Sequence, residues 1–385
     1  MSKLDDLRVE IDQVDWELTK LFEQRLALTA QVGEYKRNHN LPVLDAKREQ
    51  QVLETKRSLV TNTENQAAVT DLFEAIMAIS RRQQRIIPVK NISETVPLPC
   101  KIRSPITKPK VCHQGEAGAY GEEAAVRFFG ETVCLSRVKT FEDVFLALRQ
   151  GEVDYGVLPM ENNSTGAITA VYDLFSQYGC YIVGEQVVPV QHCLMAPKGS
   201  TLETIREVYS HEQGFFQSKA FLKQKPDWQL HPVENTAAAA KLVAVSNDPA
   251  KAAIGSPRAA KLYGLLILAS EINDAKRNGT RFVILSKEPE HRDGSNKMSA
   301  LFTVPHKSGS LNQILAVLAS YGLNMMKLES RPILSRPWEY LFFVDFSGDW
   351  NMPHVQAAME ELSTLSSLQI LGNYKGAIEQ GGEKR

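Results

Sequence analysis

The chain has 385 residues, enough for two or three domains at the usual size of about 150 residues each. Its 44 lysine and arginine residues nearly balance 45 acidic residues, and the resulting formal charge of −1 argues against a nucleic-acid-binding protein. Hydrophobic residues make up 43 % and charged residues 23 %, which is typical of a globular chain. The apolar runs are shorter than the roughly 20 residues of a membrane span. The acidic N-terminus is unlike a signal peptide, and five scattered cysteines favour a reducing cytoplasm.

Residues 1–87 carry a helical pattern. Apolar side chains recur every seven positions in two registers over residues 3–36, and Arg25 is the one charged member of these five heptads. At roughly 1.5 Å per residue, such a helix would be about 50 Å long. Because so short a segment cannot cover this stripe by itself, we expect it to pack against another subunit in a homodimer or larger oligomer. Further helices are expected at 45–58 and 64–84, followed by a proline-rich linker at 88–109.

Three further cations accompany Arg25 in this segment. Arg8 and Lys36 each follow a stripe residue directly, and Arg48 opens the second predicted helix. A lone arginine in the stripe could simply extend past the helix or pair across a dimer seam. Four cations without a nucleophile–base pair instead favour a site for a small dicarboxylate, whose reaction needs only restraint and charge stabilisation. The polar residues beside this set are Asp45, Glu49, Ser80 and Gln84.

The spacing of these residues, R-(x)16-R-(x)10-K, D-x-x-R-E and S-x-x-x-Q, resembles that of the all-helical bacterial chorismate mutases. Members of that family rearrange chorismate to prephenate in a pericyclic step without protein acid–base chemistry. The resemblance implies that three arginines hold carboxylates: Arg8 from the partner chain, Arg25 and Arg48. It also implies that Lys36 and Gln84 face the ether oxygen, where negative charge grows. By the same resemblance, the ring hydroxyl and the pose are fixed by Asp45, Glu49 and Ser80.

Residues 110–287 alternate short β-rich runs with helical patterns. This alternation favours an α/β domain of parallel sheets with crossover helices, in which ligands bind at the carboxyl ends of the strands. One sheet would be large for this length, so we expect two lobes with a cleft, as in periplasmic binding proteins. A second, shorter linker is expected at 288–297, where the sequence is polar and has no apolar period.

Two motifs stand out in the α/β segment. In PMENNSTGAITAVYDL (159–174), a predicted strand runs through polar residues into a predicted helix, which would place polar side chains and free N–H groups at one sheet end. In GTRFVIL (279–285), Thr280 and Arg281 precede a β-rich run. Each alone is also explained by a capped helix or a hydroxyl at a strand start. Together they resemble the paired signatures of prephenate dehydratase, and five further stretches match in order: GEAGAYGEEAA, HCL, YSHEQGFFQ, ENTAAAA and IGSPRAAKLYGL.

Prephenate dehydratases remove CO₂ and water from prephenate to give phenylpyruvate, and a proton donor near the departing 4-hydroxyl is the main need. The resemblance implies that Thr280 interacts with this leaving group. The polar pocket around it would be formed by Glu161, Asn162 and Gln217. The identity of the proton donor stays open between Thr280, Glu161 and water. A substrate carboxylate would be held by Ser164, Thr165, Gly166 and Arg281.

Residues 298–376 follow the order strand, helix, strand, strand, helix, strand, which is that of ferredoxin-like folds. GSLNQIL (309–315) and ESRP (329–332) resemble the two motifs of phenylalanine-binding ACT domains. The resemblance implies an allosteric phenylalanine site at Gly309, Ser310, Leu311, Glu329, Ser330 and Arg331. The alternative is a structural dimerisation module.

These parts together predict a bifunctional cytoplasmic enzyme. An all-helical mutase domain (1–87) would precede a two-lobed α/β dehydratase domain (110–287) and a ferredoxin-like regulatory domain (298–376). Its partners would be chorismate, prephenate and the inhibitor phenylalanine, with no metal, organic cofactor, nucleic acid or membrane. Two alternatives stay open: a dehydratase whose helical domain is only structural, and an amino-acid sensor without catalysis. The complete set of cations argues against the first, and Thr280 and Glu161 argue against the second.

Overall fold

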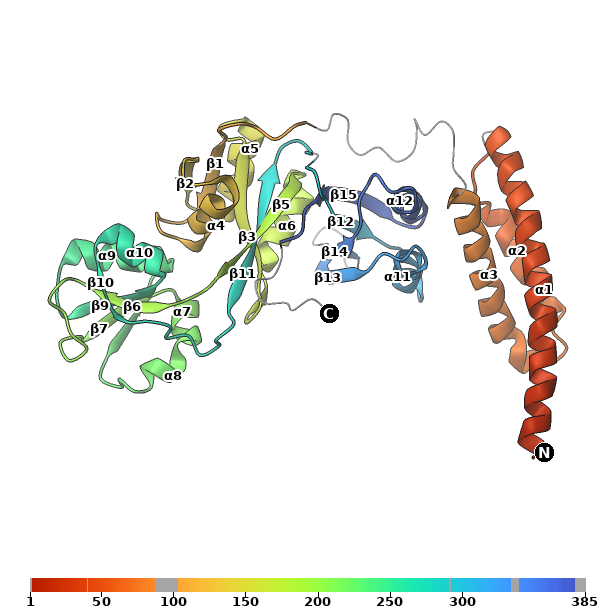
Figure 1. The fold of residues 1–385 in the computed structure, drawn as a ribbon, viewed down its shortest axis with the longest axis horizontal. Coiled ribbons are helices and arrows are strands. Elements are labelled where there is room, and N and C mark those ends of the chain that lie inside the picture. The colour runs from red at the N-terminus through yellow and green to blue at the C-terminus, as the bar shows by residue number, and fades with distance from the viewer. Residues whose placement is uncertain (1, 40, 87–102, 291, 334–338, 378–385) are drawn as a thin grey trace. The chain divides into compact units, whose positions relative to one another are not determined.

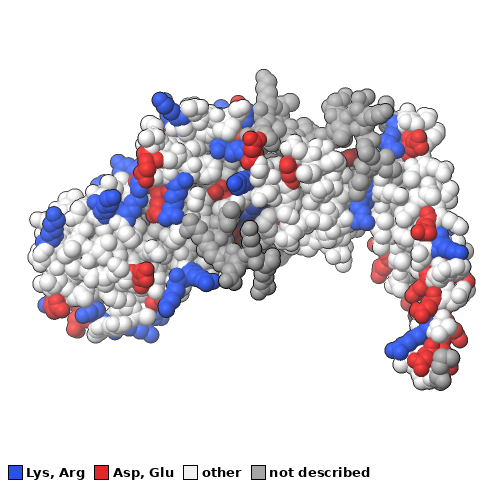
Figure 2. Space-filling view, in the orientation of Figure 1, with Lys and Arg blue, Asp and Glu red and all other residues white. Residues whose placement is uncertain are grey.

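The computed structural model of the protein describes residues 2–39, 41–86, 103–290, 292–333 and 339–377. Along the chain, three N-terminal helices precede an α/β domain with two sheets, and a third sheet closes the described residues (Figure 1). None of the described helices combines the length and the apolar composition that crossing a bilayer requires. Acidic and basic side chains are interspersed over the face in Figure 2.

Helices α1 and α2 begin at capping residues, and all three N-terminal helices end within two residues of the predicted bounds. Helix α1 (Lys3–Asn38) starts at Ser2, which forms a capping box with Asp5. Helix α2 (Ala46–Ser58) starts at Asp45, whose Oδ1 accepts the Arg48 backbone N–H at 3.0 Å. A 3₁₀ turn, η1 (Thr63–Asn65), leads into α3 (Gln66–Ile86). The three predicted helices are therefore confirmed.

The heptad stripe of α1 is largely uncovered in the single chain. Leu21 and Leu28 are each 62 % exposed and Val14 is 63 % exposed. Side chains of this kind gain stability by leaving water, so a contiguous row of them is a surface for association.

The first sheet of the α/β domain has the strand order β2-β1-β3-β11-β5, with β4 paired to β3. Its strands are β1 (Lys110–Gln114), β2 (Cys134–Val138), β3 (Tyr155–Asn162), β4 (Gly166–Ala167), β5 (Tyr181–Pro189) and β11 (Gly279–Ser286), and the helices of this lobe are α4 (Tyr120–Phe129), α5 (Phe141–Gln150) and α6 (Thr169–Tyr178). The expectation of purely parallel sheets is wrong, because β11 is antiparallel to both β3 and β5. The reason is the connection: β11 returns from a second lobe and enters the sheet from the end at which β5 leaves it.

The second lobe has its own sheet, with the order β10-β6-β9-β7-β8. Its elements are β6 (Cys193–Ala196), β7 (Glu207–Ser210), α7 (Glu212–Gln217), α8 (Lys219–Leu222), β8 (Gln229–Pro232), α9 (Thr236–Ser246), β9 (Lys251–Gly255), α10 (Pro257–Tyr263) and β10 (Leu266–Ala269). The two segments that join the lobes are hydrogen-bonded to each other, since the Val190 N–H donates to the Asn278 carbonyl at 2.8 Å and the Ile272 N–H donates to the His192 carbonyl at 3.0 Å. The predicted division into two lobes is confirmed.

The third sheet has the strand order β13-β14-β12-β15 and is antiparallel throughout. Its strands are β12 (Lys297–Thr303), β13 (Met325–Pro332), β14 (Tyr340–Ser347) and β15 (Ser367–Tyr374), and the chain forms α11 (Ser310–Ser320) and α12 (Pro353–Leu365) between them. The predicted order of elements is therefore confirmed.

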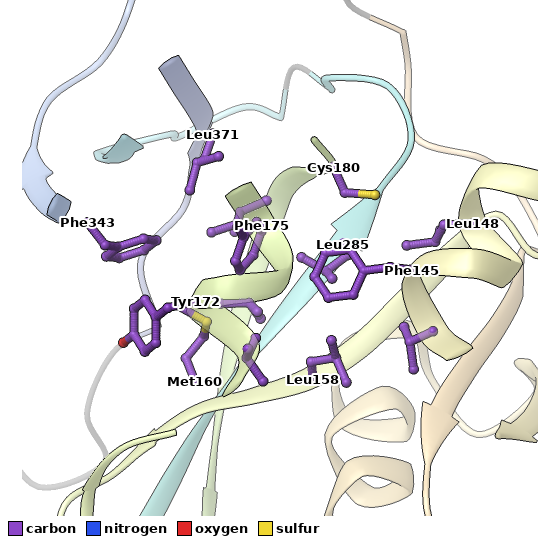
Figure 3. Packing of buried hydrophobic residues seen from close by; sticks show 14 of the residues in the cluster. Phe145, Leu148, Leu158, Met160, Tyr172, Phe175, Cys180, Leu285, Phe343 and Leu371 are labelled. Atoms are coloured by element: carbon purple, nitrogen blue, oxygen red, sulfur yellow. The ribbon is translucent and has the colours of Figure 1, made fainter. Parts of the chain in front are cut away.

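The third sheet shares a hydrophobic core with the first lobe (Figure 3). The Phe343 ring of β14 packs edge-on against Tyr172 of α6, with the ring centroids 4.8 Å apart, and Leu371 of β15 joins the same cluster. A Cβ atom at Gly372 would lie 1.9 Å from the carbonyl oxygen of Ile182, so only glycine permits this approach of β15 to β5.

The predicted linker at 288–297 is not a free linker. Glu290 is 6 % exposed, and its carboxylate accepts hydrogen bonds from Arg103 at 2.9 Å and from the Tyr155 hydroxyl at 2.5 Å. Polar composition misled the prediction, because these partners are distant in sequence. The predicted linker at 88–109 lies outside the described residues up to 102, and residues 103–109 belong to the α/β domain through Arg103 and Ile106, whose N–H donates to Tyr155.

Candidate functional sites

Two residues of the first predicted set, Arg25 and Ser80, meet between α1 and α3. The Arg25 guanidinium donates to the Ser80 hydroxyl at 2.5 Å, and Ser80 in turn donates to the Ile76 carbonyl at 2.8 Å. The Lys36 ammonium group donates to the Val43 carbonyl at 2.7 Å, beyond the end of α1. Burial lowers the pKa of Arg25, and the nearby carboxylate of Glu49 opposes this effect. Two predicted cations thus lie half-buried along the inner side of α1.

Gly33 brings α1 close to α3 at Gln84. A Cβ atom at position 33 would lie 2.7 Å from Cγ of Gln84, which is too short for any side chain to fit without displacing the glutamine. Gln84 is 8 % exposed, and its Oε1 atom has no hydrogen-bond partner among the described residues. A buried amide oxygen without a partner is costly, so it marks a position where a ligand would complete the hydrogen bonding.

The remaining predicted residues of this set do not all lie at one place. Glu49 pairs with Arg81 of α3 at 2.6 Å, and Arg81 is a residue that the sequence reasoning missed although it directly follows Ser80. Asp45 uses its carboxylate to cap α2, and the Arg48 side chain is exposed. Arg8 lies 17 residues before Arg25 on the same helix, so about 26 Å separates them along the axis. Within one chain, Arg8 therefore does not reach the other cations.

A second set forms a polar cluster where the two lobes meet, made of Asn162, Ser164, Gln217, Asn278 and Thr280. The Asn162 amide donates to the Thr280 hydroxyl at 2.9 Å and to Asn278 Oδ1 at 2.8 Å. From the second lobe, the Gln217 amide donates to the Ser164 hydroxyl at 3.2 Å. Thr280 is 8 % exposed and Asn278 Nδ2 has no hydrogen-bond partner among the described residues. The predicted residues Asn162, Ser164, Gln217 and Thr280 are thus brought together.

The turn after β3 differs from the expected helix start. Residues 163–165 form a hairpin turn, β4 follows, and α6 begins only at Thr169. The backbone N–H groups of Ser164 and Thr165 donate to Asn162 Oδ1 at 3.0 and 3.2 Å, so they are not free to bind an anion. Gly166 has a φ of +83°, as the turn into β4 requires. The expectation of an open helix N-terminus here is wrong, because the Asn162 side chain occupies these donors.

Arg281 belongs to a charge cluster with five other ionisable residues: Glu161, Glu185, Lys297, Lys327 and Asp345. Its guanidinium contacts Glu161 at 2.6 Å, Glu185 at 3.0 Å and Asp345 at 3.1 Å. Lys297 pairs with Glu185 at 2.8 Å, and Lys327 of β13 pairs with Glu161. Because three carboxylates surround the nearly buried Arg281, these contacts do not favour the predicted role of binding a substrate carboxylate.

The charge cluster sets the ionisation of Glu161. Burial alone would raise the pKa of this carboxyl group, but Arg281 and Lys327 together hold it below its ordinary value. The lowered pKa favours the ionised form of Glu161 and so does not support Glu161 as the proton donor.

The polar cluster continues to two residues that the sequence reasoning missed as site residues. His192 Nε2 lies 2.9 Å from Gln217 Oε1, and its Nδ1 lies 3.2 Å from the Tyr120 hydroxyl. Burial lowers the pKa of His192, and the hydrogen bond to Gln217 opposes this effect. The stretches that contain Tyr120 and His192 were matched as motifs, but nothing in a single sequence connects them across 72 residues.

A cavity of about 140 Å³ lies at the end of the third sheet. Its lining includes two of the predicted phenylalanine-binding residues, Ser310 and Leu311; the others are Val304, Pro305, His306, Lys307, Tyr340 and Phe342. Gly309 adjoins this lining with a φ of +82°. On β13, Arg331 pairs with Asp173 of α6 at 2.8 Å, and this pairing raises the pKa of Arg331.

Comparison with known proteins connects these sites to two activities. Residues 7–85 match the family model of chorismate mutase type II, and residues 111–290 match that of prephenate dehydratase. The bifunctional chorismate mutase/prephenate dehydratase of Aquifex aeolicus is 34 % identical over 382 residues, which is 99 % of this chain and 100 % of that protein. The chain belongs to the family of bifunctional chorismate mutase/prephenate dehydratases. It rearranges chorismate to prephenate and converts prephenate to phenylpyruvate, so the alternative of a sensor without catalysis is excluded.

Two solved structures resemble the dehydratase part. The prephenate dehydratase from Arthrobacter aurescens, solved in complex with L-Phe, has a TM-score of 0.65 at 27 % identity and covers 72 % of this chain and 93 % of its own. A protein described as a quorum quenching acylase, GqqA, has a TM-score of 0.64 at 30 % identity and covers 70 % of this chain and 98 % of its own. The mutase match falls on the N-terminal helices, and the dehydratase match includes both the polar cluster and Glu161.

Proposed function

We propose that the mutase site lies between α1 and α3, with Arg25 and Lys36 as its cations and Gln84 as its amide. The unpartnered oxygen of Gln84 beside Gly33 supports this site. The rearrangement needs the substrate held in a folded conformation while negative charge grows on the ether oxygen. Arg25 would hold a carboxylate, and Lys36 would stabilise the ether oxygen by turning its ammonium group from Val43. Asp45, Arg48, Glu49 and Ser80 would complete the binding site.

We propose further that Arg8 comes from a partner chain in a homodimer. The uncovered stripe of α1 and the length of helix between Arg8 and Arg25 support this arrangement. Mixing an Arg8→Ala chain with a Lys36→Ala chain tests it. If Arg8 acts across the interface, mixed dimers carry one site with both defects and one intact site, so mutase activity returns. If Arg8 acts within its own chain, no mixed dimer regains activity.

For the dehydratase, we propose that Thr280 acts on the leaving 4-hydroxyl. Loss of the ring carboxylate as CO₂ sends its bonding electron pair into the ring, which becomes aromatic by releasing the hydroxyl. This hydroxyl takes one proton and leaves as water. Asn162 donates to the Thr280 oxygen, so the hydroxyl hydrogen of Thr280 is free to donate to the leaving oxygen, and the proton derives from water. Gln217, with Ser164, Thr165 and Gly166 of the hairpin, would hold the substrate.

Phenylalanine would inhibit the dehydratase by binding the C-terminal domain, which we assign to the ferredoxin-like ACT class. The βαββαβ order, the cavity at Ser310 and Leu311, and the bound L-Phe of the Arthrobacter relative support this assignment. Glu329, Ser330 and Arg331 on β13 would complete the site. An inhibitor that binds outside the dehydratase site acts by binding one conformation of the protein more tightly than another. The shared core and the charge cluster provide the mechanical connection.

The proposed compartment is the cytoplasm, and the four described cysteines, all unpaired, fit a reducing environment. The site assignments are tested together with full-length protein, assayed once from chorismate and once from prephenate. Lys36→Ala should lower mutase turnover by roughly two orders of magnitude and spare the dehydratase, and Thr280→Ala should do the reverse. Thr280→Ser should retain a substantial part of dehydratase turnover. Equal loss of both activities in either alanine variant contradicts two separate sites.

A further inference from the structure

The hydrogen bonds of the polar cluster have a direction that the backbone fixes. Asn162 Oδ1 must be an acceptor, because the N–H groups of Ser164 and Thr165 point at it. The Ser164 hydroxyl lies 2.7 Å from the same oxygen and therefore donates to it. Because the only hydroxyl hydrogen of Ser164 is used in this bond, the Ser164 oxygen can only accept from the Gln217 amide nitrogen. It follows that Gln217 Oε1 faces the other way, toward His192.

The same logic fixes the state of the His192 ring. Since Gln217 Oε1 only accepts, the hydrogen of the imidazole is on Nε2, which lies 2.9 Å away. Nδ1 is then only an acceptor, and the Tyr120 hydroxyl shares its one hydrogen between Nδ1 and the Gln191 carbonyl, each 3.2 Å from its oxygen. The ring is 2 % exposed, so the neutral form is favoured. The Nε2–H tautomer of a neutral imidazole therefore satisfies the bond to Gln217.

His192 is also anchored where the chain crosses between the lobes. Its backbone N–H donates to Asn273 Oδ1 at 2.5 Å, and its carbonyl accepts from the Ile272 N–H at 3.0 Å. The Gln217 carbonyl accepts from the Asp274 N–H at 2.7 Å, which ties the end of α7 to the same crossing segment. The ring is therefore held independently of the substrate.

We propose that His192 is a positioning residue of the dehydratase, which orients the Gln217 carboxamide so that its hydrogens face Ser164 and the polar cluster. The proposal rests on the proposed placement of the dehydratase site at that cluster. Without the Nε2 donor, the Gln217 amide can rotate, and its oxygen would then face Ser164. The Ser164 hydroxyl would be drawn away from Asn162, whose own amide supports the Thr280 oxygen. His192 would thus act on turnover without touching the substrate.

The test compares three variants of His192 in the full-length protein, assayed with prephenate. His192→Gln keeps a donor near the position of Nε2, whereas His192→Asn is too short to reach Gln217 and His192→Phe removes the donor altogether. We expect kcat to fall about tenfold in the last two, the rate equivalent of one hydrogen bond, and to stay within about threefold of wild type in His192→Gln. KM and the thermal unfolding midpoint of His192→Asn should match those of His192→Gln.

A Gln217→Ala background separates positioning from a structural role. If His192 acts through Gln217, His192→Asn should cause no further loss in that background. An equal loss with and without Gln217 overturns the proposal, as does a His192→Gln variant no better than His192→Asn. If Gln217→Ala alone keeps wild-type turnover, the placement of the dehydratase site falls. If Gln217→Ala is impaired while His192→Asn and His192→Phe are not, only the role of His192 falls.

Discussion

The Glu161 carboxylate of the dehydratase domain is paired with the Lys327 ammonium group of β13 in the C-terminal sheet. Glu161 directly precedes Asn162, the last residue of β3, so a residue next to the polar cluster is held by a residue of the proposed regulatory domain. The whole charge cluster divides in the same way. Glu161, Glu185 and Arg281 come from the α/β domain and sum to −1, and Lys297, Lys327 and Asp345 come from the third sheet and sum to +1. The two parts therefore complement each other in charge.

Replacing Lys327 with methionine should raise the pKa of Glu161, because the effect of burial would then be opposed by Arg281 alone. The acid limb of dehydratase kcat/KM against pH should move to higher pH. Above the unfolded-state pKa of about 4.3, Glu161 is charged in both states and the pairing stabilises the fold. This contribution is lost as the pH falls through the depressed folded-state value.

The same variant should lose about 1–3 kcal/mol of unfolding free energy near neutral pH. Lys287→Met is the matched control, because this substitution removes the same charge. Among the described residues, Lys287 donates only to the Arg149 carbonyl. An acid limb that stays in place in Lys327→Met would show that the pairing does not control Glu161.

Gly33→Ala should abolish most mutase turnover while the dehydratase is unchanged. Alanine normally stabilises a helix interior by about 0.5–1 kcal/mol relative to glycine, so any loss must come from the contact with Gln84. Adding Gln84→Ala removes the atom in conflict. The double variant should regain the thermal stability of the N-terminal helices but not the mutase activity. Normal turnover from chorismate in the Gly33→Ala variant would show that Gln84 is not part of the mutase site.

Gly309→Val should weaken inhibition by phenylalanine without lowering uninhibited turnover. The φ of +82° suits glycine, and a β-branched side chain there would distort the chain beside Ser310 and Leu311. Gly309→Asn is the control, since asparagine tolerates this conformation. Phenylalanine titrations of phenylpyruvate formation should give a higher midpoint for valine than for asparagine. Equal midpoints for wild type and Gly309→Val would remove position 309 from the regulatory site.

Phe343→Ala should destabilise the dehydratase domain although Phe343 belongs to the C-terminal sheet. Its ring packs on Tyr172 in the shared core, and truncations of this kind cost about 3–5 kcal/mol. Thermal inactivation of the dehydratase should occur at lower temperature, with mutase inactivation unchanged. Met326→Ala, on the exposed side of β13, should leave both unchanged. For the same reason, truncation after Lys287 should reduce stability as well as inhibition.

The elements were predictable from the sequence where a local pattern determines them. The heptad repeat marked the first N-terminal helix, and the C-terminal order of strands and helices was read from periodicity. Strand direction has no such local pattern, and β11 was therefore assigned to a parallel sheet. Glu290 was assigned to a linker for a similar reason, because its partner Arg103 lies 187 positions away.

The candidate sites were predictable as sets of residues but not as contacts. Thr280, Asn162 and Gln217 came from motifs, and they meet as expected. Arg281 stands in the same motif as Thr280, yet alternate residues of a strand face opposite sides, so its side chain reaches the charge cluster instead. His192 was matched only as part of the HCL stretch, since its role depends on a tautomer that only its three-dimensional neighbours specify.

The way the second lobe joins the first has an evolutionary consequence. Strands β5 and β11 are antiparallel neighbours, with Pro189 paired to Gly279, so the chain leaves and re-enters the first sheet at one point. Residues 190–278 thus have the topology of a single inserted gene segment, and a short hairpin could replace them without changing the order of any other strand. Segments from other two-lobed proteins could be exchanged at this junction. Since Gln217 and Asn278 lie within the insert and Thr280 outside it, such an exchange would replace one side of the polar cluster and keep Thr280.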